Sequence, residues 1–189
     1  KSIEGAEDRT DSAINDLNKY NIQKGDVIIG ISTSGAAKYV QTALNHGKEL
    51  GCKTIYLICN KDPFYHANVD LTISIEVGPE IITGSTRMKA GTATKLVLNM
   101  ISTVSMIKIN KTYGNYMVDL KISNNKLLDR GTRIISEITG LDYDNSQLLL
   151  KKANKNVKTA IVMELMNLSY QDANDKILSN NGKLSNVLK

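Results

Sequence analysis

The chain has few aromatic residues, few cysteines and no long uninterrupted hydrophobic run. Aromatic residues make up only 5% of its 189 residues and Trp is absent, whereas hydrophobic residues make up 41%. A core of this composition must be aliphatic. The length suits one sizeable domain with a small appendage.

Two cysteines, Cys52 and Cys59, are too few for a disulfide framework and lack the spacing of a metal site. The most hydrophobic segment, residues 96–109, is interrupted by several polar residues, so no membrane-spanning helix is predicted. We also find no signal-peptide pattern. We therefore expect a cytoplasmic protein with no membrane partner.

The charge pattern excludes a further class of partner. The net charge is +5, from 24 basic and 19 acidic residues, and no basic run alternates with aromatics. This pattern indicates a solvated surface that mildly attracts anions, so nucleic-acid binding is not predicted. His46 and His66 lie apart with no partner spacing, and neither a metal site nor a cofactor is predicted.

Strand and helix patterns alternate through the first part of the chain. Val27–Ile31 and Thr54–Cys59 are apolar runs typical of parallel strands buried on both faces. Leu71–Val77 alternates apolar and polar residues, which predicts a strand with one face more exposed to solvent. A helix is predicted over Ile3–Tyr20 and another after Ala90. The alternation predicts an α/β fold with a parallel sheet.

A loop rich in hydroxyl groups follows the first predicted strand. It contains Ser32, Thr33, Ser34 and Gly35, and helical spacing begins directly after it. Strand, hydroxyl-rich turn and helix form an arrangement that binds anions through free backbone N–H groups. The glycine spacing matches neither a P-loop nor a dinucleotide fingerprint. Such serine runs also occur as simple helix caps.

A second loop of this kind spans residues 78–89. It combines the hydroxyls of Ser85 and Thr86 with the cationic side chains of Arg87 and Lys89, and a helix follows. A phosphate or carboxylate is a sensible ligand here, and a plain capped helix start is an equally good interpretation. Because both loops follow parallel strands, they are expected at one edge of the sheet, where ligands bind in such folds.

The run GPEIITGSTRMKAGTATKLVLNM closely resembles the signature shared by N-acetylmuramic acid 6-phosphate etherases and the glucokinase regulatory protein. The segment Asn115–Asp119 and the helical tail also resemble the etherases. Both groups contain sugar isomerase (SIS) domains. The resemblance implies a three-layer sandwich around a parallel sheet, a sugar phosphate as ligand, no cofactor, and a homodimer.

The resemblance also implies roles for individual residues. The run EGAED at residues 4–8 matches the second of two active-site carboxylates, which falls on Glu7. Without the resemblance, Glu7 would be read as a helix-capping acid. The first hydroxyl loop would bind the phosphate or sugar hydroxyls. The second loop would orient the anionic groups, and Glu80 is a weaker candidate that could equally cap its own loop.

Two features depart from the etherase pattern. Ala37 stands where related loops often have Thr, which could weaken the phosphate site, although Lys38 could restore a positive donor. The chain begins at Lys1 without Met and lacks the upstream glycine-rich segment with the first catalytic Glu. We therefore expect an N-terminally truncated fragment, which could be inactive on its own.

The sequence divides into a sugar-phosphate-binding domain at residues 1–140 and a small helical subdomain at 141–189, resembling the ubiquitin-associated-like tail of etherases. Helices are predicted over Asn124–Thr139, from Ser146, over Val157–Met166 and over Gln171–Ser179. The subdomain could be a packing appendage, a dimer arm or a lid.

The expected function is cleavage of the D-lactyl ether of N-acetylmuramic acid 6-phosphate, in the recycling of cell-wall amino sugars. The products would be N-acetylglucosamine 6-phosphate and D-lactate. Two alternatives stay open. A non-catalytic sugar-phosphate sensor would keep both loops without an acid–base pair, and an aldose–ketose isomerase of the same fold would also move a proton at C2.

Overall fold

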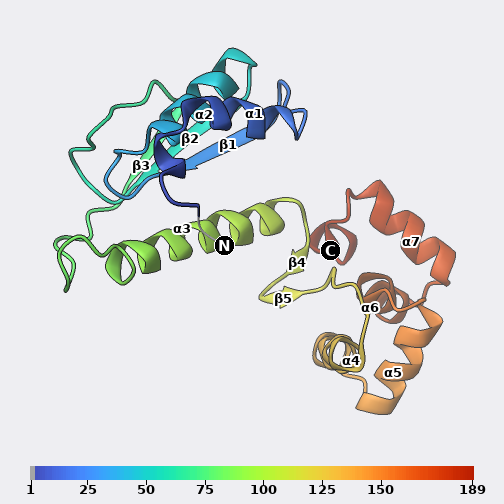
Figure 1. Ribbon diagram of the computed structural model, residues 1–189. Coiled ribbons are helices and arrows are strands. Elements are labelled where there is room, and N and C mark those ends of the chain that lie inside the picture. Colours follow the sequence, from blue (N-terminus) through green and yellow to red (C-terminus); the bar gives the residue numbers. More distant parts are fainter. Residues whose placement is uncertain (1–2) are drawn as a thin grey trace. The chain divides into compact units, whose positions relative to one another are not determined.

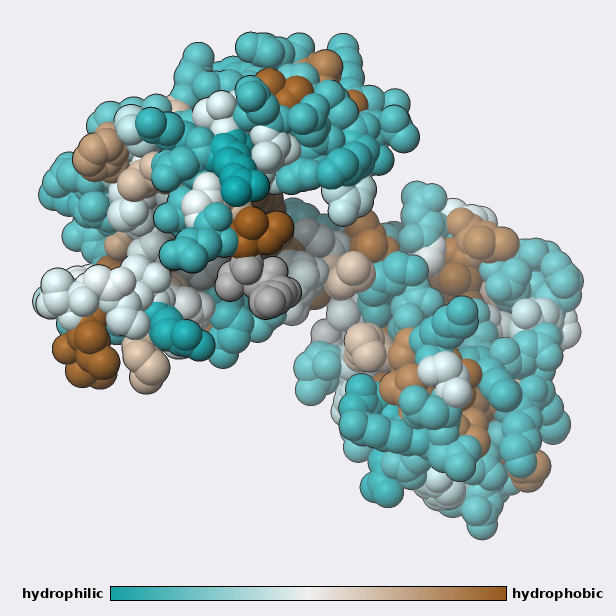
Figure 2. All heavy atoms as spheres, viewed as in Figure 1, coloured by the Kyte–Doolittle hydropathy of each residue, from teal (hydrophilic) through white to brown (hydrophobic). Residues whose placement is uncertain are grey.

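The computed structural model describes residues 3–189 (Figure 1). The chain forms two compact units, one up to Asn99 and the other from Met100 onward. A mostly hydrophilic surface with separate hydrophobic groups is visible in Figure 2. Each unit has its own hydrophobic core.

A three-stranded parallel sheet forms the centre of the first unit, in the order β1-β2-β3. The strands are β1 (Val27–Ile31), β2 (Lys53–Ile58) and β3 (Leu71–Ser74). The structure thus confirms the predicted parallel α/β fold. The third strand was predicted to reach Val77 but ends at Ser74. The last hydrogen bond between the two strands runs from the Ile75 N–H to the Ile58 carbonyl at 2.9 Å, and pairing stops there because Ile58 is the last residue of β2.

One face of the sheet is covered by α2 (Lys38–Glu49). Leu44 on this helix is fully buried and packs with Tyr56 and Ile58 of β2. Gly30 allows the close approach, because a Cβ atom at this position would lie 2.7 Å from side-chain atoms of both Leu44 and Val40. The buried strand and the helix after it are therefore fitted to one another.

The helix predicted over Ile3–Tyr20 is wrong in its first part. The structure has a 3₁₀ helix, η1 (Ala6–Asp8), and then α1 (Thr10–Asn18), which packs on α2. Gly5 precedes η1 with a φ of 67°, in the left-handed region that glycine adopts readily. Arg9 separates the two helices with a non-helical ψ of 88°.

The long helix α3 (Lys89–Lys108) begins at the end of the sheet. Ala90 in its first turn is 1% exposed, and the Sγ atom of Cys59, directly after β2, lies 3.8 Å from its carbonyl oxygen. In Figure 1, α1 and α2 lie on one side of the sheet and α3 begins on the other. Within residues 3–189, no helix is long and apolar enough to cross a membrane.

Besides the last part of α3, the second unit contains a short hairpin and five helices. The hairpin joins β4 (Thr112–Tyr113) to β5 (Tyr116–Met117). The helices are α4 (Asn125–Thr139), α5 (Tyr143–Lys152), α6 (Val157–Met166), α7 (Tyr170–Ser179) and α8 (Leu184–Val187). The predicted helices of this region are confirmed.

Sequence signals explain where these helices begin and end. Asn124, Asp142, Asn156 and Ser169 each accept a hydrogen bond from a backbone N–H in the first turn of the helix that follows. Gly140 ends α4 with a φ of 80°.

The predicted domain boundary at residue 140 stays a prediction, but the packing divides the chain elsewhere. Helix α4, placed by the sequence with the sheet, shares a core with α5 and α6 instead. Its buried Ile134 and Ile135 lie in the same hydrophobic cluster as Leu150 and Ile161. In the structure, α4 therefore packs within the second unit.

A buried lysine ties three segments of the second unit together. Lys158 of α6 is 6% exposed, and its Nζ donates to the carbonyl oxygens of Asn110 at 2.7 Å and Gly182 at 3.0 Å. The Asp119 carboxylate lies 3.6 Å away and also pairs with Lys111. Burial lowers the pKa of Lys158, against the attraction of Asp119.

Candidate active site

The turn after β1 is held by a set of backbone hydrogen bonds. The Ser32 N–H donates to the Leu57 carbonyl at 3.0 Å, which extends the pairing with β2 by one residue. The Gly35 N–H then donates to the Ser32 carbonyl at 3.3 Å, and the Ala37 N–H to the Ser32 Oγ at 3.4 Å. Ser32 is 8% exposed, so its hydroxyl shapes the turn from inside.

The segment at residues 63–65 supports the turn through backbone hydrogen bonds and packing. The N–H groups of Phe64 and Tyr65 donate to the carbonyls of Ser34 and Gly35 at 3.0 and 3.1 Å. Gly35 is buried and has a φ of 77°, and a Cβ atom there would lie 2.5 Å from Cβ of Pro63. Only glycine therefore fits this position without moving the support.

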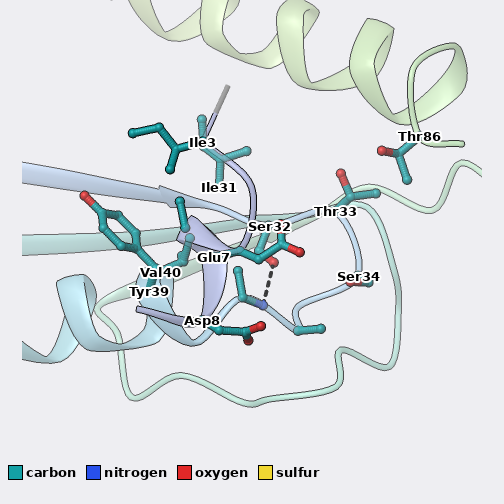
Figure 3. Close-up of a pocket in the computed structure, with 13 residues that line it drawn as sticks. Ile3, Glu7, Asp8, Ile31, Ser32, Thr33, Ser34, Tyr39, Val40 and Thr86 are labelled. Atoms are coloured by element: carbon teal, nitrogen blue, oxygen red, sulfur yellow. Dashed lines mark hydrogen bonds between the residues drawn. The ribbon is translucent and has the colours of Figure 1, made fainter. Parts of the chain in front are cut away.

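The turn opens into a cavity of about 620 Å³ (Figure 3). The lining comes from the segment before α1, from the turn with the start of α2, and from the second loop. The lining residues are Ile3, Ala6, Glu7, Asp8, Ile31, Ser32, Thr33, Ser34, Ala36, Ala37, Tyr39, Val40 and Thr86. Polar and apolar groups thus meet in one hollow, as in a small-molecule site.

Two carboxylates line this cavity. Glu7 and Asp8 both belong to η1, and both are exposed. The side chain of Glu7 extends toward the turn in Figure 3. Glu7 was named as a site residue from the sequence and Asp8 was not, although Asp8 follows Glu7 directly in the same acidic run. A carboxylate beside a row of hydroxyls can exchange a proton with a ligand that those hydroxyls hold.

Tyr39 is a second lining residue that the sequence reasoning missed. Its hydroxyl donates to Oδ2 of Asp16 at 3.0 Å, and Asp16 also pairs with Lys19 at 2.7 Å. Burial and the Asp16 carboxylate raise the pKa of Tyr39. This bond joins α1 to α2, and η1, which carries the two carboxylates, also packs on α2.

The second loop contributes only one of its predicted residues to the cavity. Thr86 lines it, whereas Ser85, Arg87, Lys89 and Glu80 are not among the lining residues. Arg87 is exposed, and Ser85 donates its N–H to the Ile82 carbonyl at 3.0 Å. The two hydroxyl loops therefore reach one hollow through Thr86.

Glu80 and Lys89 have partners within their own loop. The Glu80 carboxylate accepts the backbone N–H of Lys89 at 3.1 Å and that of Ala90 at 3.0 Å. These two N–H groups hold the pKa of Glu80 below its usual value. The Lys89 Nζ donates to the Pro79 carbonyl at 2.7 Å.

No cluster of three or more His, Cys, Asp or Glu side chains that could hold a metal ion occurs among residues 3–189. Both cysteines are buried thiols, and Cys59 contacts the Thr94 hydroxyl at 3.6 Å.

Two family models match this chain. The model of the SIS domain matches residues 9–104, and that of the C-terminal lid domain of glucokinase regulatory protein matches residues 114–158. The first covers the sheet, α1, α2, both loops and most of α3, and the second covers β5, α4 and α5.

Curated relatives match the chain over its whole length. It is 43% identical to N-acetylmuramic acid 6-phosphate etherase of Geobacillus thermodenitrificans, with 100% of this chain and 64% of the relative covered. It is 45% identical to the etherase of Rhodopirellula baltica, of which it covers 62%, and 45% identical to that of Pseudothermotoga lettingae, of which it covers 63%. The chain thus spans less than two thirds of the length of these relatives. It belongs to the SIS-domain family and is similar throughout to proteins named as N-acetylmuramic acid 6-phosphate etherases.

Proposed function

We propose that this chain forms the greater part of an N-acetylmuramic acid 6-phosphate etherase, which releases D-lactate and N-acetylglucosamine 6-phosphate. The observation that supports this most directly is one cavity lined by Glu7, by the Ser32–Ser34 turn and by Thr86. The same chain is 43–45% identical to three etherases.

The phosphate is assigned to the turn between β1 and α2. Helix α2 begins at Lys38, its N-cap residue Ala37 makes no side-chain capping bond, and its first turn contains no acidic residue. An uncapped helix start presents N–H groups and a positive dipole end to an anion. Ser32, Thr33, Ser34 and Gly35 would surround the phosphate, and Lys38 at the start of the helix adds positive charge.

The reaction needs proton transfers and no change of oxidation state. Opening the sugar ring gives an aldehyde, which makes the proton on C2 acidic. Glu7 takes that proton, the C3–O bond breaks, and a second acidic group donates a proton to the lactate oxygen as it leaves. Water then adds across the resulting double bond. A carboxylate in this role contributes roughly 100- to 10,000-fold to the rate.

Arg87 is proposed as the partner of the lactyl carboxylate, with Ser85 beside it. Arg87 follows Thr86 directly in the chain, and a guanidinium group can bind a carboxylate through two parallel hydrogen bonds. For Lys89 and Glu80, the hydrogen bonds within the loop favour a role in holding its shape. The proposal also includes a cytoplasmic location and a homodimer. Sedimentation of the purified protein would test the homodimer.

A sugar-phosphate sensor is the second candidate. The match of residues 114–158 to the lid domain of glucokinase regulatory protein favours it. A sensor would bind the sugar phosphate in the same cavity and leave its ether bond intact.

Lactate release separates the two candidates. The protein, extended to the length of its relatives, is incubated with N-acetylmuramic acid 6-phosphate, and D-lactate is measured with a lactate-specific enzymatic assay. The etherase predicts stoichiometric release of lactate and N-acetylglucosamine 6-phosphate. Saturable binding without any lactate would contradict the etherase and support the sensor.

A further inference from the structure

The start of α3 is occupied by a carboxylate from its own loop. A helix start leaves its first N–H groups without partners inside the helix and attracts an anion. Here Oε2 of Glu80 accepts the N–H of Lys89, and Oε1 accepts the N–H of Ala90, at 3.1 and 3.0 Å. The Glu80 carboxylate therefore occupies the anion position at the start of α3.

Other bonds connect the same loop to the first turns of α3. The Lys89 Nζ donates to the carbonyl of Pro79, which directly precedes Glu80. The Gly91 N–H donates to the Thr86 carbonyl at 3.0 Å. Both ends of the loop are thereby fixed to the same short piece of helix.

That piece of helix is in turn fixed to the sheet. Ala90 is 1% exposed, and its carbonyl lies 3.8 Å from the Cys59 thiol at the end of β2. Cys59 also donates its N–H to the Thr33 carbonyl at 3.0 Å, inside the hydroxyl turn. A continuous set of contacts thus joins Glu80, α3, β2 and the turn that lines the cavity.

We propose that Glu80 is a positioning residue: its carboxylate fixes the second loop on α3 so that Thr86 lies at the cavity, and it keeps the start of α3 from taking the substrate anion. Glu80 itself touches no substrate. This inference rests on the proposed function for the identity of the ligand, and its structural half can be tested without any ligand.

The first experiment measures hydrogen exchange of single backbone amides by NMR in the unliganded chain. Glu80→Gln removes the negative charge at nearly constant shape, and Glu76→Gln, at an exposed position before the loop, is the matched control. We expect Glu80→Gln to speed exchange of the Lys89, Ala90 and Gly91 amides by roughly tenfold. Unchanged exchange at Gly91 would overturn the claim that Glu80 holds the loop.

The second experiment is a double-mutant cycle on the affinity for N-acetylmuramic acid 6-phosphate, measured by calorimetry with the protein extended to the length of its relatives. Glu80→Gln and Thr86→Val should each weaken binding, and the double variant should bind no more weakly than Thr86→Val alone. Thr83→Val, an exposed hydroxyl of the same loop outside the cavity, should have no effect.

The results of the two experiments separate a failure of the positioning role from a failure of the proposed function. Additive losses in the cycle would overturn the positioning role, because Glu80 would then act on the ligand independently of Thr86. Tighter binding of the sugar phosphate by Glu80→Gln would also overturn the positioning role, because that role requires the variant to bind more weakly than the unmutated protein. Absence of any sugar-phosphate binding by the unmutated protein would overturn the proposed function, while the exchange rates would still decide whether Glu80 fixes the loop.

Discussion

Glu7 and Ser32 line the same cavity, although one lies on a short 3₁₀ helix before α1 and the other follows β1. The α1–α2 packing, with its bond from Tyr39 to Asp16, brings the two together. A carboxylate and the hydroxyl-rich turn after β1 thus line one cavity.

Glu7→Gln should slow lactate release strongly while leaving substrate binding nearly unchanged. The amide keeps the shape of the side chain but cannot take a proton from C2, so the rate should fall roughly 100- to 10,000-fold. Glu4→Gln, an exposed acid outside the cavity, is the control. Steady-state kinetics and calorimetry on the extended protein provide the two measurements, and an equal loss in both variants would argue against a catalytic Glu7.

Ser34→Ala should weaken the binding of sugar phosphates. Loss of a hydrogen bond to a charged group costs about 1.5–3 kcal/mol, which corresponds to roughly 10- to 100-fold in affinity. Ser74→Ala changes an exposed serine at the end of β3, outside the cavity, and should bind normally. Titration calorimetry with N-acetylglucosamine 6-phosphate compares them. If both variants bind alike, the phosphate lies elsewhere.

Gly35→Ala should damage the turn more than an equivalent change at Gly51. Both positions have a positive φ, 77° and 80°, so alanine is strained in each by about 1–2 kcal/mol. At Gly35 the new Cβ also meets Pro63 at 2.5 Å, whereas at Gly51 its nearest contact, Lys24, is 3.4 Å away. Chemical denaturation should show a larger loss for Gly35→Ala, and equal losses would mean that the Pro63 contact is easily relieved.

The stability contributed by Asp70 should disappear in acid. Its carboxylate accepts the Thr54 N–H at 2.9 Å and pairs with Lys53 at 3.0 Å, and these bonds hold its pKa well below the usual value of 3.8. A depressed pKa stabilises the folded state above the unfolded value and ceases to do so as the pH falls through the folded value.

Asp70→Asn should therefore be less stable than the unmutated chain at pH 7, and the difference should shrink as the pH falls below about 4. Asp62→Asn, in an exposed loop, is the control. Denaturant titrations at a series of pH values make the comparison. A difference that is constant with pH would show that packing, rather than charge, explains the effect.

Lys158→Ala should destabilise the second unit. The carbonyls of Asn110 and Gly182 would lose their donor, at about 1–3 kcal/mol, and Asp119 would keep Lys111 as its remaining cation. Lys151→Ala, on the exposed face of α5, provides the comparison. Hydrogen exchange in α6 reports the loss, and equal protection in both variants would contradict a structural role for Lys158.

Local patterns along the chain determined most of the secondary structure. The apolar run Val27–Ile31 is β1 without change, and the predicted helix over Val157–Met166 is α6. Gly140 ends α4 because a left-handed residue is needed there, and this signal is readable in the sequence. The hydroxyl turn after β1 was likewise predictable, since a buried strand followed by serine residues and a helix is a local pattern.

Only the tertiary structure decided which residues meet. Helix α4 has the same amphipathic pattern whether it packs on the sheet or on α5 and α6, so the sequence alone could not assign it. Glu80 and Lys89 are equally suited to a ligand and to a loop, and the fold pairs them with the loop because the start of α3 lies beside them. Periodicity reports how each segment buries its own apolar face, whereas the choice of partner depends on shapes that only the folded chain brings together.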